Sequence, residues 1–228
     1  MYRPSVSQPL GVGLLVALVV LALSACAGGG DGQQVKARPL PEESQALRPG
    51  EYRSEEFKPS LSFSVGKGWT NAALEVPENL GLIWGESAGL SFVNAQQIHV
   101  YKPTRTGTPN VVDAPKDMVG WFQHHPYLQT STPEPVTVGG VEGEQFNVVV
   151  GDLPEGYLGI CGRDCVATLI FSDGTSLGIY PQDKLRLIVL EDVNGKRVVM
   201  GFGSPASEFD EHAVEAQKVI DTVEWTGL

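Results

Sequence analysis

The residues with the clearest potential for chemistry form the pentapeptide GESAG at 85–89. This G-x-S-x-G pattern is that of the nucleophile elbow of serine hydrolases, and Asp173 and His212 follow Ser87 in the order Ser, Asp, His. An elbow must open into a helix, whereas residues 90–101 alternate and are rich in strand formers. No glycine-rich loop that could form an oxyanion hole precedes it. We therefore expect a hairpin turn at 85–89 and keep an esterase-type hydrolase as the least favoured functional hypothesis.

The other polar residues do not form the pattern of a metal site or an acid–base pair. His124 and His125 are adjacent in a predicted helix, so they point apart and cannot bind one ion together. His99 and His212 lie far from them in sequence, and we expect all four at the surface or at helix ends. Zinc spacing, calcium-loop spacing and phosphate-binding glycine loops are missing. We predict no metal and no cofactor, and we expect solvated faces for the neighbouring carboxylates Glu55/Glu56, Glu191/Asp192 and Asp210/Glu211.

The most specific pattern lies near the N-terminus, at Leu23-Ser24-Ala25-Cys26. Arg3, an apolar run at 11–23 and then small residues stand in the order of a secretory signal. The run is shorter than the roughly 20 apolar residues that span a bilayer. The four positions resemble a bacterial lipobox, which implies cleavage after residue 25, lipid (palmitate) on Cys26, and a cell-membrane protein facing the extracytoplasmic side. The alternative is an uncleaved N-terminal anchor with Cys26 as an ordinary buried thiol.

The two remaining cysteines agree with export to an oxidising compartment. Cys161 and Cys165 are four residues apart, and we predict a disulfide that closes this small loop. Such a loop is worth roughly 2 kcal/mol of stability. Free thiols and a redox or metal role are the alternatives. A redox pair normally has two intervening residues beside a βαβ unit, and zinc would need further ligands nearby.

Length and charge restrict the classes of function. Removing the signal peptide, residues 1–25, leaves 203 of the 228 residues, enough for one large domain. Arg3 is the only charge lost, so 15 basic and 27 acidic residues remain. Nucleic-acid binding needs basic groups that displace counterions, so we expect no nucleic-acid partner. Residues 26–49 are rich in glycine, proline and polar residues and predict a flexible tether with a reach of roughly 26 Å. The globular domain is then expected over 50–228.

Hydrophobic periodicity predicts the strands of that domain. Apolar residues alternate at 61–65, and strand-forming runs occupy 80–84, 90–101 and 141–150. A Gly139-Gly140 turn precedes the last of these. Two further hairpins are predicted by Asp173-Gly174, which joins 167–171 to 176–180, and by Asn194-Gly195, which joins 185–190 to 197–202.

Two helices complete the predicted fold. The first spans about 114–124 with Asp113 as its N-cap, and its core-facing residues are Met118, Trp121 and Phe122. The second carries an apolar stripe before a short final strand; the stripe consists of Phe209, Ala213, Ala216, Ile220 and Val223. We therefore predict an α+β fold, with a single mostly antiparallel sheet covered by a mid-chain helix and a C-terminal helix.

The strand LSFSVGKGW, the single mid-chain helix, the later hairpins and the terminal helix running into VIDTVEW resemble the PsbP-like fold over about 50–227. That family includes photosystem-associated PsbP proteins and several actinobacterial lipoproteins. The resemblance implies a binding or assembly factor rather than an enzyme. The proline often found in the first turn of that family is replaced here by Gly66-Lys67-Gly68.

These observations predict a membrane-anchored cell-envelope lipoprotein that acts as a non-catalytic binding or interaction module. Its expected partners are the membrane, through the lipid on Cys26, and an envelope protein or apolar ligand. The alternative is a carrier of an apolar small molecule or lipid. In that case a cavity between sheet and helices would be lined by Trp69, Trp84, Trp121 and Phe122.

Overall fold

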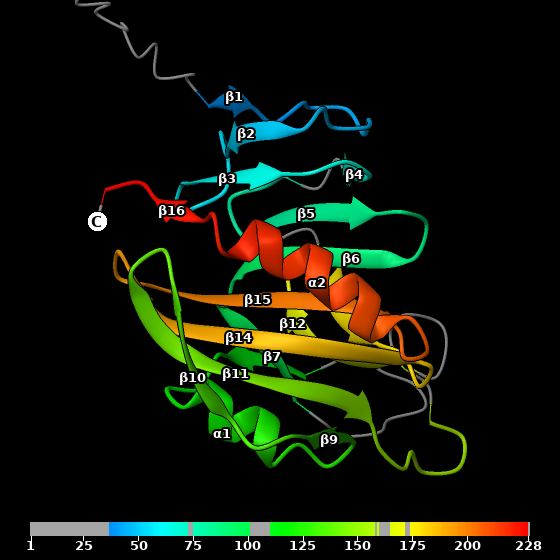
Figure 1. Ribbon diagram of the computed structural model, residues 1–228. Coiled ribbons are helices and arrows are strands. Elements are labelled where there is room, and N and C mark those ends of the chain that lie inside the picture. Colours follow the sequence, from blue (N-terminus) through cyan, green and yellow to red (C-terminus); the bar gives the residue numbers. More distant parts are fainter. Residues whose placement is uncertain are drawn as a thin grey trace, which may run out of the picture. The chain divides into compact units, whose positions relative to one another are not determined.

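Strands dominate the computed structural model, which describes residues 37–72, 75–100, 110–157, 159, 165–171 and 174–227. The fold is α+β, as predicted, with three sheets whose strands pair antiparallel except for β1 and β2 (Figure 1). The prediction of a single sheet is therefore wrong. No helix in these described residues is long and apolar enough to cross a membrane.

The eight-stranded sheet forms the centre of the described domain. Its strands, in spatial order, are β10 (Glu134–Val138), β11 (Val141–Val150), β14 (Asp183–Val193), β15 (Lys196–Pro205), β6 (Ala88–Asn94), β5 (Asn79–Trp84) and β4 (Trp69–Asn71), with β9 (Leu128–Thr130) also beside β11. One four-stranded sheet contains β1 (Arg38–Pro39), β2 (Gly50–Arg53), β3 (Leu61–Val65) and β16 (Glu224–Trp225). The other contains β13 (Ser176–Ile179), β12 (Val166–Ile170), β7 (Gln97–Val100) and β8 (Asn110–Asp113).

The central strands need cover on both faces, which explains the additional sheets. On β14, Leu187 and Val189 belong to one buried cluster, whereas Ile188 and Leu190 belong to another. Successive strand residues point to opposite faces, so both faces of this strand are apolar. Two helices, α1 (Met118–Gln123) and α2 (Phe209–Ile220), cannot cover both faces by themselves. The first cluster includes residues of β7, β12 and α1, and the second includes residues of β3 and α2.

Helix α2 confirms the predicted apolar stripe. Phe209, Ala216 and Ile220 are buried, and the helix contacts β15 and β3. Figure 1 shows it crossing the front of β6 and β15. His212 is buried on the same helix, which the sequence pattern does not predict.

The first helix begins later than predicted. Its N-cap is Asp117, whose side chain accepts the backbone N–H of Gly120 at 2.7 Å. Asp113 instead ends strand β8. The predicted strand at 90–101 is also two strands, because the β6 ladder ends at Asn94 and Ala95 donates its N–H to the Arg197 carbonyl before β7 begins.

Residues 37–49, which the sequence pattern assigns to the tether, pack on the domain. Leu40 and Leu47 are buried. The Arg38 guanidinium lies 4.4 Å from the centre of the Tyr52 ring and donates hydrogen bonds to the carbonyls of Arg48 and Pro49. The described domain therefore includes chain that composition alone would leave in a linker.

Candidate functional site

The GESAG segment is a hairpin turn. Strand β5 ends at Trp84, the turn occupies residues 85–87, and β6 begins at Ala88. Gly85 has φ +61°, which suits glycine in a tight turn. The strand–turn–strand context predicted for this motif is confirmed, and the strand-to-helix elbow of the hydrolases does not occur at these residues.

Ser87 and His212 nevertheless lie close together through Glu208. The Ser87 hydroxyl donates to Glu208 Oε2 at 3.1 Å, and His212 Nε2 lies 3.7 Å from the same oxygen. A catalytic triad places the imidazole between the serine and the acid, whereas here the carboxylate stands between them. Asp173 lies outside the described residues. The contact connects the start of α2 to the β5–β6 hairpin.

The other residues singled out by sequence have separate locations. Cys26 and Cys161 lie outside the described residues, so lipidation and the disulfide stay predictions. Cys165 is fully buried directly before β12. His99 and His125 are buried, whereas His124 is exposed.

The expectation of a surface or helix-end position is therefore wrong for His99 and His212, which are buried within β7 and α2. His125 does follow the end of α1, but it is buried. Burial lowers the pKa of His99, and it lowers the pKa of His125 to about 3. Both imidazoles are neutral near pH 7.

The four aromatic residues proposed to line an apolar cavity belong to two different clusters. Trp69 and Trp84 pack in one cluster, and Trp121 and Phe122 pack in the other, on the opposite face of the central sheet. Trp69 and Phe122 are almost completely buried. These side chains fill the two cores and do not surround one shared cavity.

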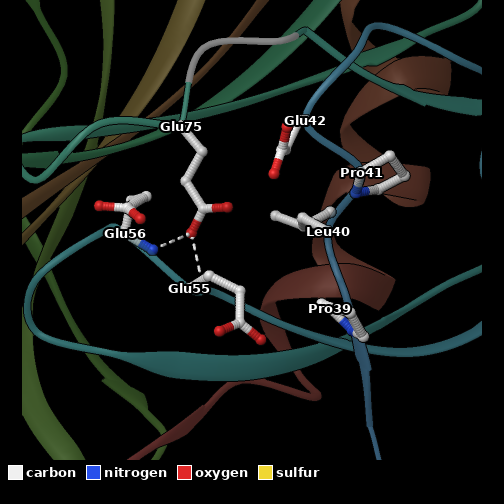
Figure 2. Close-up of a pocket in the computed structure, with 7 residues that line it drawn as sticks. All are labelled: Pro39, Leu40, Pro41, Glu42, Glu55, Glu56 and Glu75. Atoms are coloured by element: carbon white, nitrogen blue, oxygen red, sulfur yellow. Dashed lines mark hydrogen bonds between the residues drawn. The ribbon is translucent and has the colours of Figure 1, made fainter.

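A cavity of about 500 Å³ lies instead beside the N-terminal segment. Figure 2 shows one wall formed by the chain that follows β1 and a second wall formed by the loop after β2 together with the segment before β5. We call it the acidic cleft; its lining residues are Pro39, Leu40, Pro41, Glu42, Glu55, Glu56 and Glu75.

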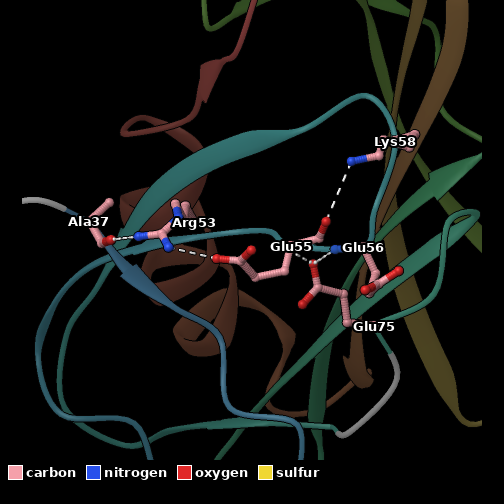
Figure 3. Close-up of polar contacts among 6 residues, drawn as sticks. All are labelled: Ala37, Arg53, Glu55, Glu56, Lys58 and Glu75. Carbon is pink, nitrogen blue, oxygen red and sulfur yellow. Dashed lines mark hydrogen bonds and ion pairs between the residues drawn. The ribbon is translucent and has the colours of Figure 1, made fainter.

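Glu75 holds the second wall in place. Its Oε1 accepts the backbone N–H groups of Glu55 at 2.7 Å, Glu56 at 3.0 Å and Phe57 at 3.3 Å. Figure 3 shows this carboxylate beneath the loop that carries the other two glutamates. The carboxylate thus satisfies amides that no strand partner reaches.

Arg53 joins the two walls of the acidic cleft. Its guanidinium pairs with the Glu55 carboxylate at 2.7 Å and also donates to the carbonyl of Ala37, directly before β1 (Figure 3). Lys58 points its ammonium at the Glu55 carbonyl, 3.4 Å away, and at Ser60 Oγ, 3.1 Å away. Its charge is therefore directed at backbone and hydroxyl oxygens.

The cleft combines an excess of negative charge with one apolar wall. Among the described residues, Glu42 and Glu56 form no ion pair, and Arg53 is the one base paired with a carboxylate of the cleft. No group of three or more metal-ligating side chains in the described part of the chain is placed to hold a metal ion. Pro39, Leu40 and Pro41 provide apolar contact. The arrangement favours a partner that presents cationic groups on an apolar body.

Sequence reasoning identified only part of this cleft. It placed Glu55 and Glu56 on a solvated face, and both side chains are exposed. It did not connect them with Glu75 or with the segment at 39–42, because the contacts that build the cleft join residues 16 to 20 positions apart. The available signal was the run PLPEE at 39–43, in which prolines stiffen a strongly acidic stretch.

No protein-family model and no curated protein matches this chain. Among solved structures, it is similar to cyanobacterial PsbP (CyanoP) from Synechocystis sp. PCC 6803, with 11% identity and a TM-score of 0.41 over 78% of this chain and 94% of that one. It is also similar to LpqN, involved in cell envelope biogenesis of Mycobacterium tuberculosis, with 12% identity and a TM-score of 0.37 over 80% and 90%.

A third similar structure is the T6SS immunity protein TplEi of Pseudomonas aeruginosa. It shares 11% identity and a TM-score of 0.33, over 80% of this chain and 54% of that one. The structural neighbours thus include a PsbP protein and an envelope-biogenesis protein, at identities and scores too low to assign a function to this chain.

Proposed function

We propose that this chain is a membrane-anchored lipoprotein of the cell envelope that acts as a non-catalytic binding module. Its binding site is the acidic cleft, and its partner presents cationic groups, as a lysine- or arginine-rich segment of an envelope protein does. The observation that carries the proposal is the cavity of about 500 Å³. This volume lies within the range of roughly 300–1,000 Å³ that is usual for ligand sites.

The cleft lies close to the proposed anchor along the chain. Only eleven residue steps separate Cys26 from Ala37, where the described domain begins. A fully extended chain of that length spans at most about 40 Å. Pro39 to Glu42 follow at once and form one wall of the cleft. A cleft in this position would meet partners that work near the membrane surface.

Replacing Cys26 by alanine tests the anchor. We expect Cys26→Ala to abolish incorporation of labelled lipid and to leave an uncleaved precursor or a released, unlipidated protein. Metabolic labelling followed by mass spectrometry of the N-terminal peptide measures both. Lipid labelling that persists in the variant would contradict the assignment of Cys26.

Charge removal tests the cleft. Full-length protein in lipid nanodiscs is titrated with a fluorescent pentalysine peptide, and the double variant Glu42→Gln/Glu56→Gln is compared with the double variant Glu142→Gln/Glu144→Gln, which removes the same charge from exposed positions of β11. Neither control residue lines the cleft. An exposed ion pair contributes about 0.2–1 kcal/mol, so we expect the double variant to weaken binding by about two- to thirty-fold.

The control should stay within two-fold of the wild type, and added salt should weaken binding of the wild type more than that of the double variant. Equal loss in the control would mean that the net charge of the domain, and not the cleft, attracts the peptide. A carrier of an apolar ligand predicts instead that extra mass co-purifies with the protein. Native mass spectrometry of the lipidated protein distinguishes the two functions.

A further inference from the structure

Strand β8 forms an open edge of the sheet β13–β12–β7–β8. It pairs with β7 on one side, and no described strand pairs with its other side. Both of its valines are exposed, Val111 at 37% and Val112 at 43%. Because they are successive strand residues, they expose apolar surface on both faces of the edge. An open apolar edge of this kind accepts another strand unless something blocks it.

Two other edges in the described residues are blocked. On β10, the pair Val138–Val141 closes a two-residue turn and is therefore hydrogen-bonded. Because hydrogen-bonded and non-hydrogen-bonded pairs alternate along the ladder, the backbone groups of Pro135 and Thr137 point away from β11. Pro135 has no N–H to offer an added strand. The outer side of β4 is covered by the N-terminal segment, since Asn71 donates its N–H to the Gln45 carbonyl. Strand β8 has neither a proline nor a covering segment among the described residues.

The hydrogen bonds identify which groups of β8 point outward. Ala114 donates its N–H to the Gln96 carbonyl at 2.9 Å, in continuation of the β7–β8 register. Hydrogen-bonded and non-hydrogen-bonded pairs alternate along an antiparallel ladder. Val112 is therefore hydrogen-bonded to β7, whereas the N–H and C=O groups of Val111 and Asp113 face the open side.

We propose that this edge pairs with the β8 strand of a second copy of the chain, antiparallel and about a two-fold axis at Val112. In that register Val111 of each copy exchanges two hydrogen bonds with Asp113 of the other, so every outward backbone group of both residues finds a partner. The two Val112 side chains oppose each other in the closely spaced, non-hydrogen-bonded pair. Such an isologous contact is the commonest kind of oligomer interface.

The neighbouring registers are less favourable. An axis at Asp113 would place two carboxylates opposite each other, which destabilises a strand pair. An axis at Val111 leaves the outward groups of Asp113 without a partner inside the strand.

Pairing of two four-residue strands buries much less than the roughly 1,200 Å² of a stable complex. The dimer is consequently weak in solution and becomes populated when copies are concentrated. Confinement to a membrane raises effective concentration as a linker does, and this last step rests on the lipid anchor of the proposed function.

Cysteine crosslinking tests the edge. The full chain carrying Val112→Cys is oxidised with copper phenanthroline, in detergent over a concentration series and in vesicles, and covalent dimer is measured on non-reducing gels against the parent protein. The matched control is Val214→Cys, because Val214 is a valine on α2 that is more exposed, at 55%. Opposed Val112 positions meet the distance that a disulfide needs. We expect at least ten-fold more dimer from Val112→Cys than from Val214→Cys, and more than from Val111→Cys.

Blocking the edge should remove the crosslink. Val111→Pro, added to Val112→Cys, deletes an N–H that bonds to no described residue of the same copy. It should return the dimer fraction to that of the control while leaving the circular dichroism spectrum intact. If that variant does not fold, Val111→Glu serves the same purpose, because it places a carboxylate directly opposite Asp113 of the other copy. Equal dimer from Val112→Cys and Val214→Cys in both media, or adducts only of other masses, would overturn the proposal. A Val112-specific dimer that is no stronger in vesicles than in detergent would retain the edge and count against the anchor.

Discussion

Glu75 should contribute more to stability than its position on the rim of a cleft suggests. Its Oε1 accepts two short hydrogen bonds, from the amides of Glu55 and Glu56, and a longer one from Phe57. A net contribution of about 0.5–1.5 kcal/mol for each of the two short bonds predicts that Glu75→Ala lowers the free energy of unfolding by about 1–3 kcal/mol. Glu75→Gln keeps an acceptor but loses its charge, and bonds to neutral acceptors are roughly half as strong, so we expect about half that loss.

Urea denaturation of the full chain, followed by tryptophan fluorescence, measures both variants, and hydrogen exchange at residues 55–57 locates the effect. Glu42→Ala is the matched control, because Glu42 lines the same cleft and no hydrogen bond to its side chain occurs in the described residues. It should change the unfolding free energy by less than about 0.5 kcal/mol, as most surface substitutions do. Equal losses in Glu75→Ala and Glu42→Ala, or unchanged exchange at 55–57, would refute the assigned role.

Two further predictions concern the core and its response to pH. Gly139 has φ +56°, and a Cβ added there would lie 2.7 Å from Trp225 Cδ1, whereas a Cβ on Gly140 (φ +83°) would meet open space. We therefore expect Gly139→Ala to be less stable than Gly140→Ala by about 1–3 kcal/mol, which denaturant titration measures. Burial lowers the pKa of His125 from 6.5 to about 3. Between pH 6.5 and about 3, His125 is protonated in the unfolded chain but not in the folded chain. The free energy of unfolding therefore falls as pH falls through this range. His125→Gln should make stability depend less on pH in this range, which urea denaturation at a series of pH values measures.

Elements with a local pattern were predictable from sequence. The alternation at 61–65 corresponds to β3, whose burial alternates in the same way. The glycine pair at 139–140 and the Asn194-Gly195 turn join the expected hairpins, and Asn194 adopts the positive φ of 54° that such a turn requires. In each case neighbouring residues contain all the necessary information.

Features that depend on distant contacts were not predictable. The run LRLIVL at 185–190 is apolar on both faces, which indicates that both faces of this strand must be covered. The pattern does not indicate which helices or strands cover them. Asp113 and Asp117 are equally plausible N-caps by composition, and pairing of Asp113 with Gln97 in β8 decides between them. His212 is buried because Trp84, from a strand far away in sequence, packs on its ring at 5.0 Å.

The acidic cleft belongs to this second class, and its construction connects the proposed anchor to the proposed site. One wall is the segment that the proposed anchor would connect to the membrane, and Arg53 attaches its beginning at Ala37 to Glu55 on the opposite wall. The Glu55 amide is held in turn by Glu75. A pull on the N-terminal segment would therefore act first on the Arg53 contacts and then on the spacing of the two walls. In a protein anchored through Cys26, partner binding in the cleft and tension in the short segment before Ala37 are consequently linked, since a ligand that bridges both walls resists their separation.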